Sequence, residues 1–151
     1  MPAAPRAPRL SPRAGSRPAE DPPEEDPLSA RPLRLLIADD DPRVRRALDA
    51  ALSEVEDLEV LGVCGSAAEL CRCATAHRPD IVLLDVHLPD AAAGLGLIGA
   101  LTRARVPVVA MSAVGGVRGA SLAAGAVAFV EKDGAADTLV DALFAAGQGP
   151  P

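Results

Sequence analysis

Four apolar runs of the chain are each followed by residues with reactive side chains. Asp39 and Asp40 follow LRLLIA, Asp85 follows DIVLL, Ser112 follows VPVVAM, and Lys132 comes soon after the run Val127–Val130. Lys132 is the only lysine among 15 basic residues, which suggests a site that needs a compact ammonium group on a flexible stem. An acid pair, a single acid, a hydroxyl and an ammonium group, each closing an apolar run, indicate one site at one edge of a sheet.

The chemistry open to such a site is phosphoryl transfer. Carboxylates as close together as Asp39, Asp40 and Asp85 would be at this edge repel one another unless protons or a cation offset their charge. Mg²⁺ suits a site with few carboxylates, several waters and a phosphate. Ser112 and Lys132 can each contact a phosphoryl oxygen, which leaves Asp85 free to act as a nucleophile and form an acyl phosphate.

The elements that must position these side chains alternate between strand and helix. Strands are expected at Leu33–Ala38, Leu58–Cys64, Ile81–Leu84, Val106–Met111 and Val127–Val130. Helices are expected from the cap Asp41-Pro42 to about Val55, from the capping box Ser66–Glu69 to about Ala76, at Leu95–Ala104, weakly within Ala113–Gly125, and at about Ala135–Ala146 after the cap Asp133. The strands lack polar alternation, which predicts an α/β fold with a doubly wound, five-stranded parallel sheet in a single domain. Ligands of such folds bind beyond the carboxyl ends of the strands.

Composition narrows the class of protein further. The chain has 151 residues, enough for one domain with its own core, and a net charge of −6, which argues against a nucleic-acid-binding surface. No apolar run approaches the roughly 20 residues needed to span a bilayer, and no secretory signal opens the chain. The three cysteines fit reduced, apolar fillers. We therefore expect a cytoplasmic protein with no membrane or direct nucleic-acid partner.

The composition also divides the chain into three parts. Residues 1–32 are rich in Pro, Ala and Arg and then turn acidic, which predicts a disordered tail, either a passive extension or an interaction segment. Residues 33–147 hold the strand and helix pattern. Residues 148–151 form a short C-terminal tail.

Four segments of the chain carry a family resemblance. They are LRLLIADDDPRVRRAL from Leu33, RPDIVLLDVHLPD from Arg78, VPVVAMSA from Val106 and GAVAFVEKD from Gly125. Together they resemble the receiver domains of two-component response regulators, over about Leu33 to Ala146. The resemblance implies the flavodoxin-like receiver fold and a role as a non-enzymatic, phosphorylation-operated signalling domain served by a sensor histidine kinase.

Applied residue by residue, the resemblance assigns a metal and acceptor site. Asp85 matches the phosphoacceptor, Asp40 a direct Mg²⁺ ligand, and Asp39 an acid that acts on the metal mainly through water. The backbone carbonyl of His87 matches the third protein ligand, and its ring is expected at the mouth of the site. Metal ligation by that ring is the less favoured interpretation, and His77 is expected to be a loop residue at the end of a helix.

The same resemblance assigns the phosphate contacts and the switch. Ser112 matches the switch hydroxyl and Lys132 the phosphate-pairing lysine. Ala113 matches a position that must be small to admit the phosphoryl group, and Phe129 matches the aromatic rotamer switch. The implied output face is formed by the fourth helix, the fifth strand and the fifth helix, which would contact a downstream protein or a second copy of the chain.

Two segments depart from the family pattern. The Asp85–Gly94 loop is one residue longer than usual for the family and is rich in alanine, which would loosen the start of the third helix. The Ala113–Gly125 segment is about two residues short and rich in glycine, which disfavours a long fourth helix. The sequence resembles the branch that usually carries a LuxR-type helix-turn-helix domain, but no such domain fits after the fifth helix, so regulation of transcription would proceed through a partner.

Two other functions stay open at this stage. One is a receiver-like interaction module that does not use phosphate, favoured by the short glycine-rich segment. The other is an Mg²⁺-dependent phosphatase of the haloacid dehalogenase type, although that family places its nucleophile after an early strand with a second Asp two residues on, where this chain has His87. A dinucleotide-binding domain is disfavoured, because ADDD fills the first strand–helix turn in place of a glycine-rich loop.

Overall fold

The computed structural model describes residues 31–148. Except for Arg31, Pro32 and Gln148, the predicted tails at 1–32 and 148–151 lie outside the described residues. The elements are β1 (Leu33–Ala38), α1 (Pro42–Ser53), β2 (Leu58–Cys64), α2 (Ala67–His77), β3 (Ile81–Asp85), α3 (Ala91–Arg103), β4 (Val108–Ser112), the 3₁₀ turn η2 (Gly115–Val117), α4 (Arg118–Ala124), β5 (Ala128–Glu131) and α5 (Ala136–Gly147).

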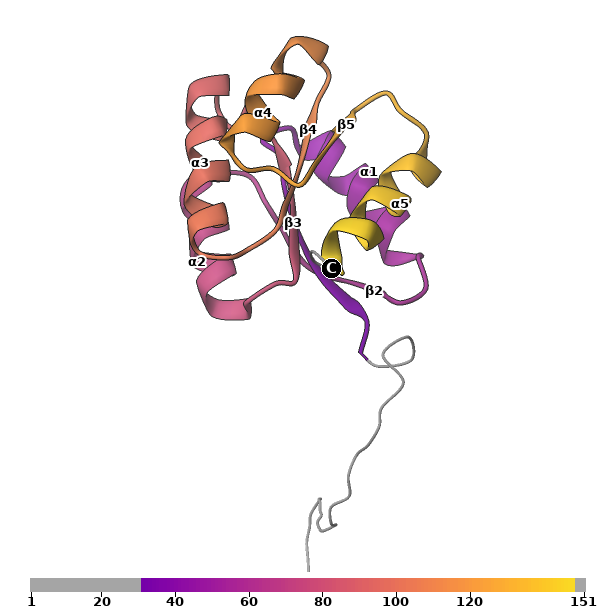
Figure 1. The fold of residues 1–151 in the computed structure, drawn as a ribbon. Helices are drawn as coiled ribbons and strands as arrows, with labels where there is room; N and C mark the ends of the chain where they lie inside the picture. Colours follow the sequence, from indigo (N-terminus) through magenta and orange to yellow (C-terminus); the bar gives the residue numbers. More distant parts are fainter. Residues whose placement is uncertain (1–30, 149–151) are drawn as a thin grey trace, which may run out of the picture. The chain divides into compact units, whose positions relative to one another are not determined.

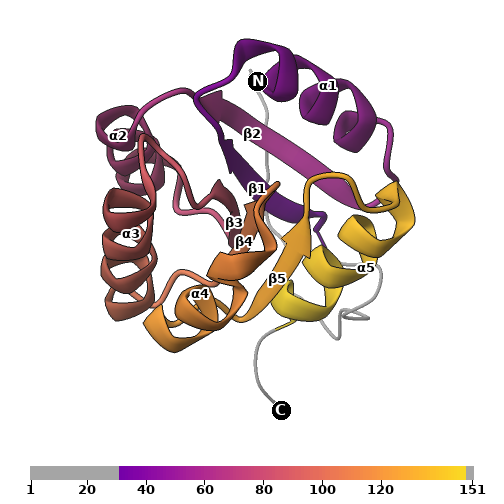
Figure 2. The ribbon, with the colours of Figure 1, turned by 90° about the horizontal axis from the view of Figure 1, so that it is seen from above.

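The five strands form one sheet in the order β2-β1-β3-β4-β5, and every neighbouring pair is parallel. Every residue of β3 and β4 is buried, as expected for central strands covered on both sides. Helices α1 and α5 cover one face of the sheet, and α2, α3 and α4 cover the other (Figures 1 and 2). The predicted doubly wound α/β fold is therefore confirmed.

Side chains that alternate along the strands supply two apolar cores. In β1, Leu36 and Ala38 belong to the core under α2, α3 and α4, whereas Leu35 and Ile37 belong to the core under α1 and α5. Both cores consist mainly of Leu, Val, Ile and Ala, and the rings of Phe129 and Phe144 lie on opposite faces.

Two of the predicted helix caps are present. The carboxylate of Asp41 accepts a hydrogen bond from the Arg43 amide at 2.9 Å, and Pro42 begins α1. The Ser66 hydroxyl accepts from the Glu69 amide at 3.2 Å. The Glu69 carboxylate, in return, accepts from the amide of Gly65 at 2.8 Å, so this capping box closes one residue earlier than the usual pattern.

The start of α3 and the cap of α5 differ from the prediction. Helix α3 begins at Ala91, because the Asp90 carboxylate accepts a hydrogen bond from the Ala93 amide at 2.9 Å. The expected start at Leu95 was wrong, and the alanine-rich stretch is the first turn of the helix. Asp133 does not cap α5, whose N-cap is Ala135 without a side-chain hydrogen bond.

Two glycine-containing segments shape the structure near the carboxyl edge of the sheet. Gly94 in α3 packs so closely against the loop after β3 that an added Cβ atom would lie 1.5 Å from the Val86 carbonyl oxygen. Helix α4 has seven residues, preceded by η2. The prediction of a short fourth helix is therefore confirmed.

Candidate functional site

The carboxyl ends of β1, β3, β4 and β5 bring the predicted reactive side chains to one edge of the sheet. Asp39 directly follows β1, Asp85 and Ser112 are the last residues of β3 and β4, and Lys132 directly follows β5. Parallel pairing aligns these ends, since Asp85 lies opposite Met111 and Ser112 opposite Glu131. Residues up to 93 positions apart in sequence thus converge because of the topology.

Three carboxylates form an acidic cluster at this edge. Asp39, Asp40 and Asp85 each offer an oxygen, and these oxygens lie within 4.8 Å of one another. Asp39 and Asp85 are buried, at 0% and 3% exposure, while Asp40 is exposed. Buried carboxylates at this spacing need a compensating cation, and three carboxylate oxygens suit a hard divalent ion.

Lys132 provides positive charge within this cluster. Its Nζ atom lies 2.8 Å from Asp39 Oδ2 and 3.2 Å from Asp85 Oδ2. Burial alone would lower the pKa of Lys132, but contacts with Asp39 and Asp85 outweigh burial, so this pKa lies above its ordinary value. Within the described residues, the ion pair with Lys132 is the one polar contact of the buried Asp39 Oδ2 atom. One lysine cannot neutralise three carboxylates, and the remaining negative charge fits a site for a metal ion.

Asp85 is held from two sides. Its Oδ1 atom accepts a hydrogen bond from the His87 amide at 3.0 Å, and its Oδ2 atom accepts one from Lys132 at 3.2 Å. The His87 imidazole does not point freely into solvent, because its Nε2 atom is buried and has no hydrogen-bond partner among the described residues. His77 is exposed at the end of α2, away from this edge.

Ser112 and Ala113 lie at the end of β4. Ser112 is fully buried, and its hydroxyl accepts a hydrogen bond from the Val114 amide at 2.8 Å. The Lys132 amide donates to the Ser112 carbonyl at 3.0 Å, which joins the ends of β4 and β5. Ala113 is exposed, so no large side chain covers the site at that position.

Phe129 is buried at 7% exposure in the core under α2, α3 and α4. The Arg118 guanidinium lies over its ring, 5.8 Å from the centroid, and contacts the Phe129 carbonyl at 3.5 Å. The distance falls within the range of a cation–π contact. Sequence reasoning did not identify Arg118, since this contact depends on how the short helix α4 lies against β5.

Arg45 is a second residue that sequence reasoning missed. Its guanidinium donates a hydrogen bond to the Asp39 carbonyl at 2.7 Å and lies over Gly65, where a Cβ atom would approach within 2.6 Å. Arg45 therefore fixes the backbone that carries Asp39. A helix arginine gives no sequence signal for such a contact.

A hollow of about 480 Å³ lies beside the cluster, between α1 and the ends of β4 and β5. Its lining consists of Asp41, Arg43, Val44, Ala47, Leu48, Met111 and Lys132. Lys132 thus borders both the acidic cluster and this hollow.

Comparison with known proteins identifies the family. The family model described as the response regulator receiver domain matches residues 35–144, so the chain belongs to this family. The signal receiver domain of the response regulator NarL from Mycobacterium tuberculosis has a similar structure, with a TM-score of 0.72 and 27% identity over 80% of this chain and 100% of that one. This chain is thus a receiver domain of the two-component type, which decides against the phosphatase alternative.

Curated relatives are longer than the region they share with this chain. The transcriptional regulatory protein YxjL of Bacillus subtilis is 28% identical over 78% of this chain and 55% of its own length. A protein-glutamate methylesterase/protein-glutamine glutaminase of Anaeromyxobacter dehalogenans is 32% identical over 72% of this chain and 33% of its own length. Within residues 31–148 every helix is too short or too polar to traverse a bilayer.

Proposed function

We propose that Asp85 accepts a phosphoryl group from the phosphohistidine of a sensor histidine kinase. An oxygen of the carboxylate attacks phosphorus, the P–N bond breaks, and its electron pair remains on the donor imidazole. The observation that carries this proposal is the setting of Asp85, 3% exposed, 3.2 Å from Lys132 and within 4.8 Å of the Asp39 and Asp40 oxygens. Lys132 supplies positive charge beside the transferred group, and the surplus of carboxylates would attract the divalent cation that adds to it.

Mg²⁺ is the proposed cofactor, held by Asp85 and Asp40, by Asp39 mainly through water, and by the carbonyl of His87. When bound, the ion would neutralise charge on the phosphoryl oxygens. The other contacts with the phosphoryl group and with Asp85 would come from residues of the chain. Lys132 would move from the acids toward the phosphoryl group, and the amide of His87 would keep the Asp85 carboxylate in place.

Ser112, Ala113 and Phe129 are the proposed switch. Ser112 would exchange its hydrogen bond from the Val114 amide for a contact with a phosphoryl oxygen, and Ala113 would leave room for that group. The exchange pulls on the end of β4, which lies against β5 and its buried Phe129. A partner that binds one arrangement of the α4–β5–α5 face more tightly would shift the population toward it.

The output would pass through that face to a downstream protein or to a second copy of this chain, in the cytoplasm. Regulation of transcription by way of a partner fits the relatives named as transcriptional regulators. Residues 33–147 would act as the receiver, with 1–32 and 148–151 as tails.

A phosphate-independent interaction module is the second candidate. The observation that favours it is the seven-residue α4, without a side-chain cap, in the segment that would form the output face. In this alternative the α4–β5–α5 face would bind its partner whether or not Asp85 carries a phosphoryl group.

Intact mass after incubation with acetyl phosphate and Mg²⁺ separates the two. We expect the wild-type chain to gain one phosphoryl group, Asp85→Ala to gain none, and EDTA added beforehand to abolish the gain. Asp133→Ala is the matched control, because this exposed carboxylate lies outside the cluster. An unmodified wild type that also fails to bind Mg²⁺ would refute phosphoacceptance and favour the second candidate.

A further inference from the structure

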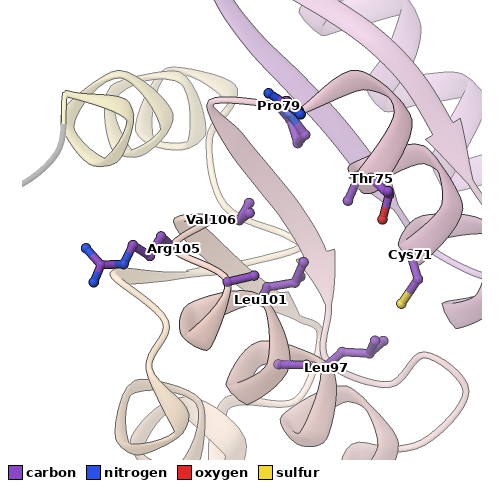
Figure 3. A pocket seen from close by; sticks show the side chains of 11 residues that line it. Cys71, Thr75, Pro79, Leu97, Leu101, Arg105 and Val106 are labelled. Carbon is purple, nitrogen blue, oxygen red and sulfur yellow. The ribbon is translucent and has the colours of Figure 1, made fainter.

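A second hollow lies at the opposite edge of the sheet, between α2 and α3 (Figure 3). It has a volume of about 580 Å³. Its lining consists of Cys71, Ala74, Thr75, Arg78, Pro79, Leu97, Ala100, Leu101, Ala104, Arg105 and Val106. Pro79 and Val106 precede β3 and β4, so this hollow is at the amino ends of the strands and shares no residue with the acidic cluster.

The floor of the hollow is apolar. Leu97 and Leu101 extend from α3 toward α2, where Cys71 and Thr75 stand across from them (Figure 3). Small side chains, among them Ala74 and Ala100, leave the space above these leucines unfilled. The space therefore suits an apolar side chain inserted from outside.

The surroundings of the hollow are basic, in contrast to the rest of the domain. Segments 67–80 and 91–107, which comprise α2, α3 and the residues that follow them, contain four arginines and two carboxylates, Glu69 and Asp80, and the lining itself contains two arginines and no carboxylate. The other described residues contain 14 acidic and seven basic side chains. An acidic group is therefore repelled less beside this hollow than beside the other described parts of the domain.

Two of these arginines, Arg78 and Arg105, line the hollow itself. Both have left-handed backbone conformations, with φ of 49° and 66°, which set them just beyond the ends of α2 and α3. Neither guanidinium forms an ion pair with any residue in the part of the chain that the structure describes. An arginine without a partner can pair with a carboxylate in bidentate geometry.

We propose that the hollow between α2 and α3 binds an acidic amphipathic peptide segment of a partner protein. An apolar side chain of the segment would insert between Leu97 and Leu101, and flanking Asp or Glu residues would pair with Arg78 and Arg105. The apolar floor favours a peptide over a nucleic acid, whose phosphates would meet a chain of net charge −6. This surface lies away from Asp85 and from the α4–β5–α5 face.

The test uses the full chain and a synthetic probe. The probe is a fluorescent peptide of about 12 residues whose helix carries leucines on one face and glutamates beside them. Saturable binding is measured by fluorescence anisotropy, and the contact surface by NMR shift changes. We expect shift changes confined to residues 71–79 and 97–106.

Two matched pairs of variants locate the binding. Ala100→Glu places a bulky acid at the exposed rim of the hollow, whereas Ala50→Glu makes the same change at an exposed position of α1. Arg105→Glu reverses a lining charge, and Arg46→Glu reverses an exposed charge on α1. We expect about fivefold weaker binding for Arg105→Glu and a greater loss for Ala100→Glu, with little change in the α1 variants.

Several results would overturn the proposal. Binding that fails to saturate, or that Arg46→Glu weakens as much as Arg105→Glu, would indicate attraction by overall charge alone. Tighter binding of a single-stranded polynucleotide, with the same dependence on Arg105, would replace the peptide by a nucleic acid. Circular dichroism of each variant shows whether it is folded. If either Ala100→Glu or Arg105→Glu unfolds the protein, the other variant still tests the proposal.

Discussion

Gly94 allows α3 to lie directly against the loop after β3, and Gly94→Ala should disrupt this contact. A Cβ atom added at Gly94 would lie 1.5 Å from the carbonyl oxygen of Val86, 2.4 Å from the carbonyl carbon of Val86 and 2.9 Å from the Cα atom of Val86. A Cβ atom in ordinary van der Waals contact lies at least 3.4 Å from such atoms. The helix and the loop would thus have to separate by about 2 Å in a close-packed region.

The magnitude follows from two opposing effects. Overpacking of a core costs about 1–3 kcal/mol, and the obstacle here is backbone that cannot rotate away, which favours the upper end. Alanine gains about 1 kcal/mol over glycine in a helix interior. We therefore expect Gly94→Ala to lower the free energy of unfolding by about 2 kcal/mol.

Gly96 offers a matched control on the same helix. A Cβ atom at Gly96 would meet nothing within 4 Å, so Gly96→Ala should raise the free energy of unfolding by up to about 1 kcal/mol. Equilibrium unfolding in urea measures both variants. A Gly94→Ala protein as stable as Gly96→Ala would refute the close approach of α3 to Val86.

Two further predictions concern the buried ionisable groups. Lys132→Met should lower the free energy of unfolding by about 2–3 kcal/mol, because Asp39 and Asp85 lose their cation. Mg²⁺ should restore more stability to this variant than to the wild type in urea titrations, and an equal response would contradict a shared site. Burial and the neighbouring Cys73 raise the pKa of Cys64 from 9.0 to about 12. The unfolded chain then releases this proton first, so the contribution of Cys64 to stability should be intact below pH 9.0 and fall as the pH rises toward about 12. Cys64→Ala should remove this part of the fall and leave the part above pH 10.5 that comes from the raised pKa of Lys132.

The sheet and the acidic cluster were predictable because their signals are local. Apolar runs mark the strands, and parallel pairing of these runs brings Asp39, Asp85, Ser112 and Lys132 to one edge whatever the details of the loops. The caps Asp41 and Ser66 were equally visible, since a cap and its helix are adjacent in sequence.

The remaining features depend on contacts between distant segments. Asp90 and Asp133 both precede a run that contains alanine, and only the packing decides that Asp90 caps a helix while Asp133 does not. The contacts of Arg45 with the Asp39 carbonyl and of Arg118 with the Phe129 ring need the helices in place. No spacing in the sequence encodes them.

The position of Lys132 also has a consequence for protein chemistry. The chain contains no other lysine, so its one side-chain amine sits between two carboxylates at the edge of the sheet. These carboxylates favour the protonated amine, which does not react with acylating reagents. The rate at which such a reagent modifies the side chain of Lys132, measured at that residue, therefore reports how strongly Asp39 and Asp85 stabilise the protonated amine, without any label added to the protein.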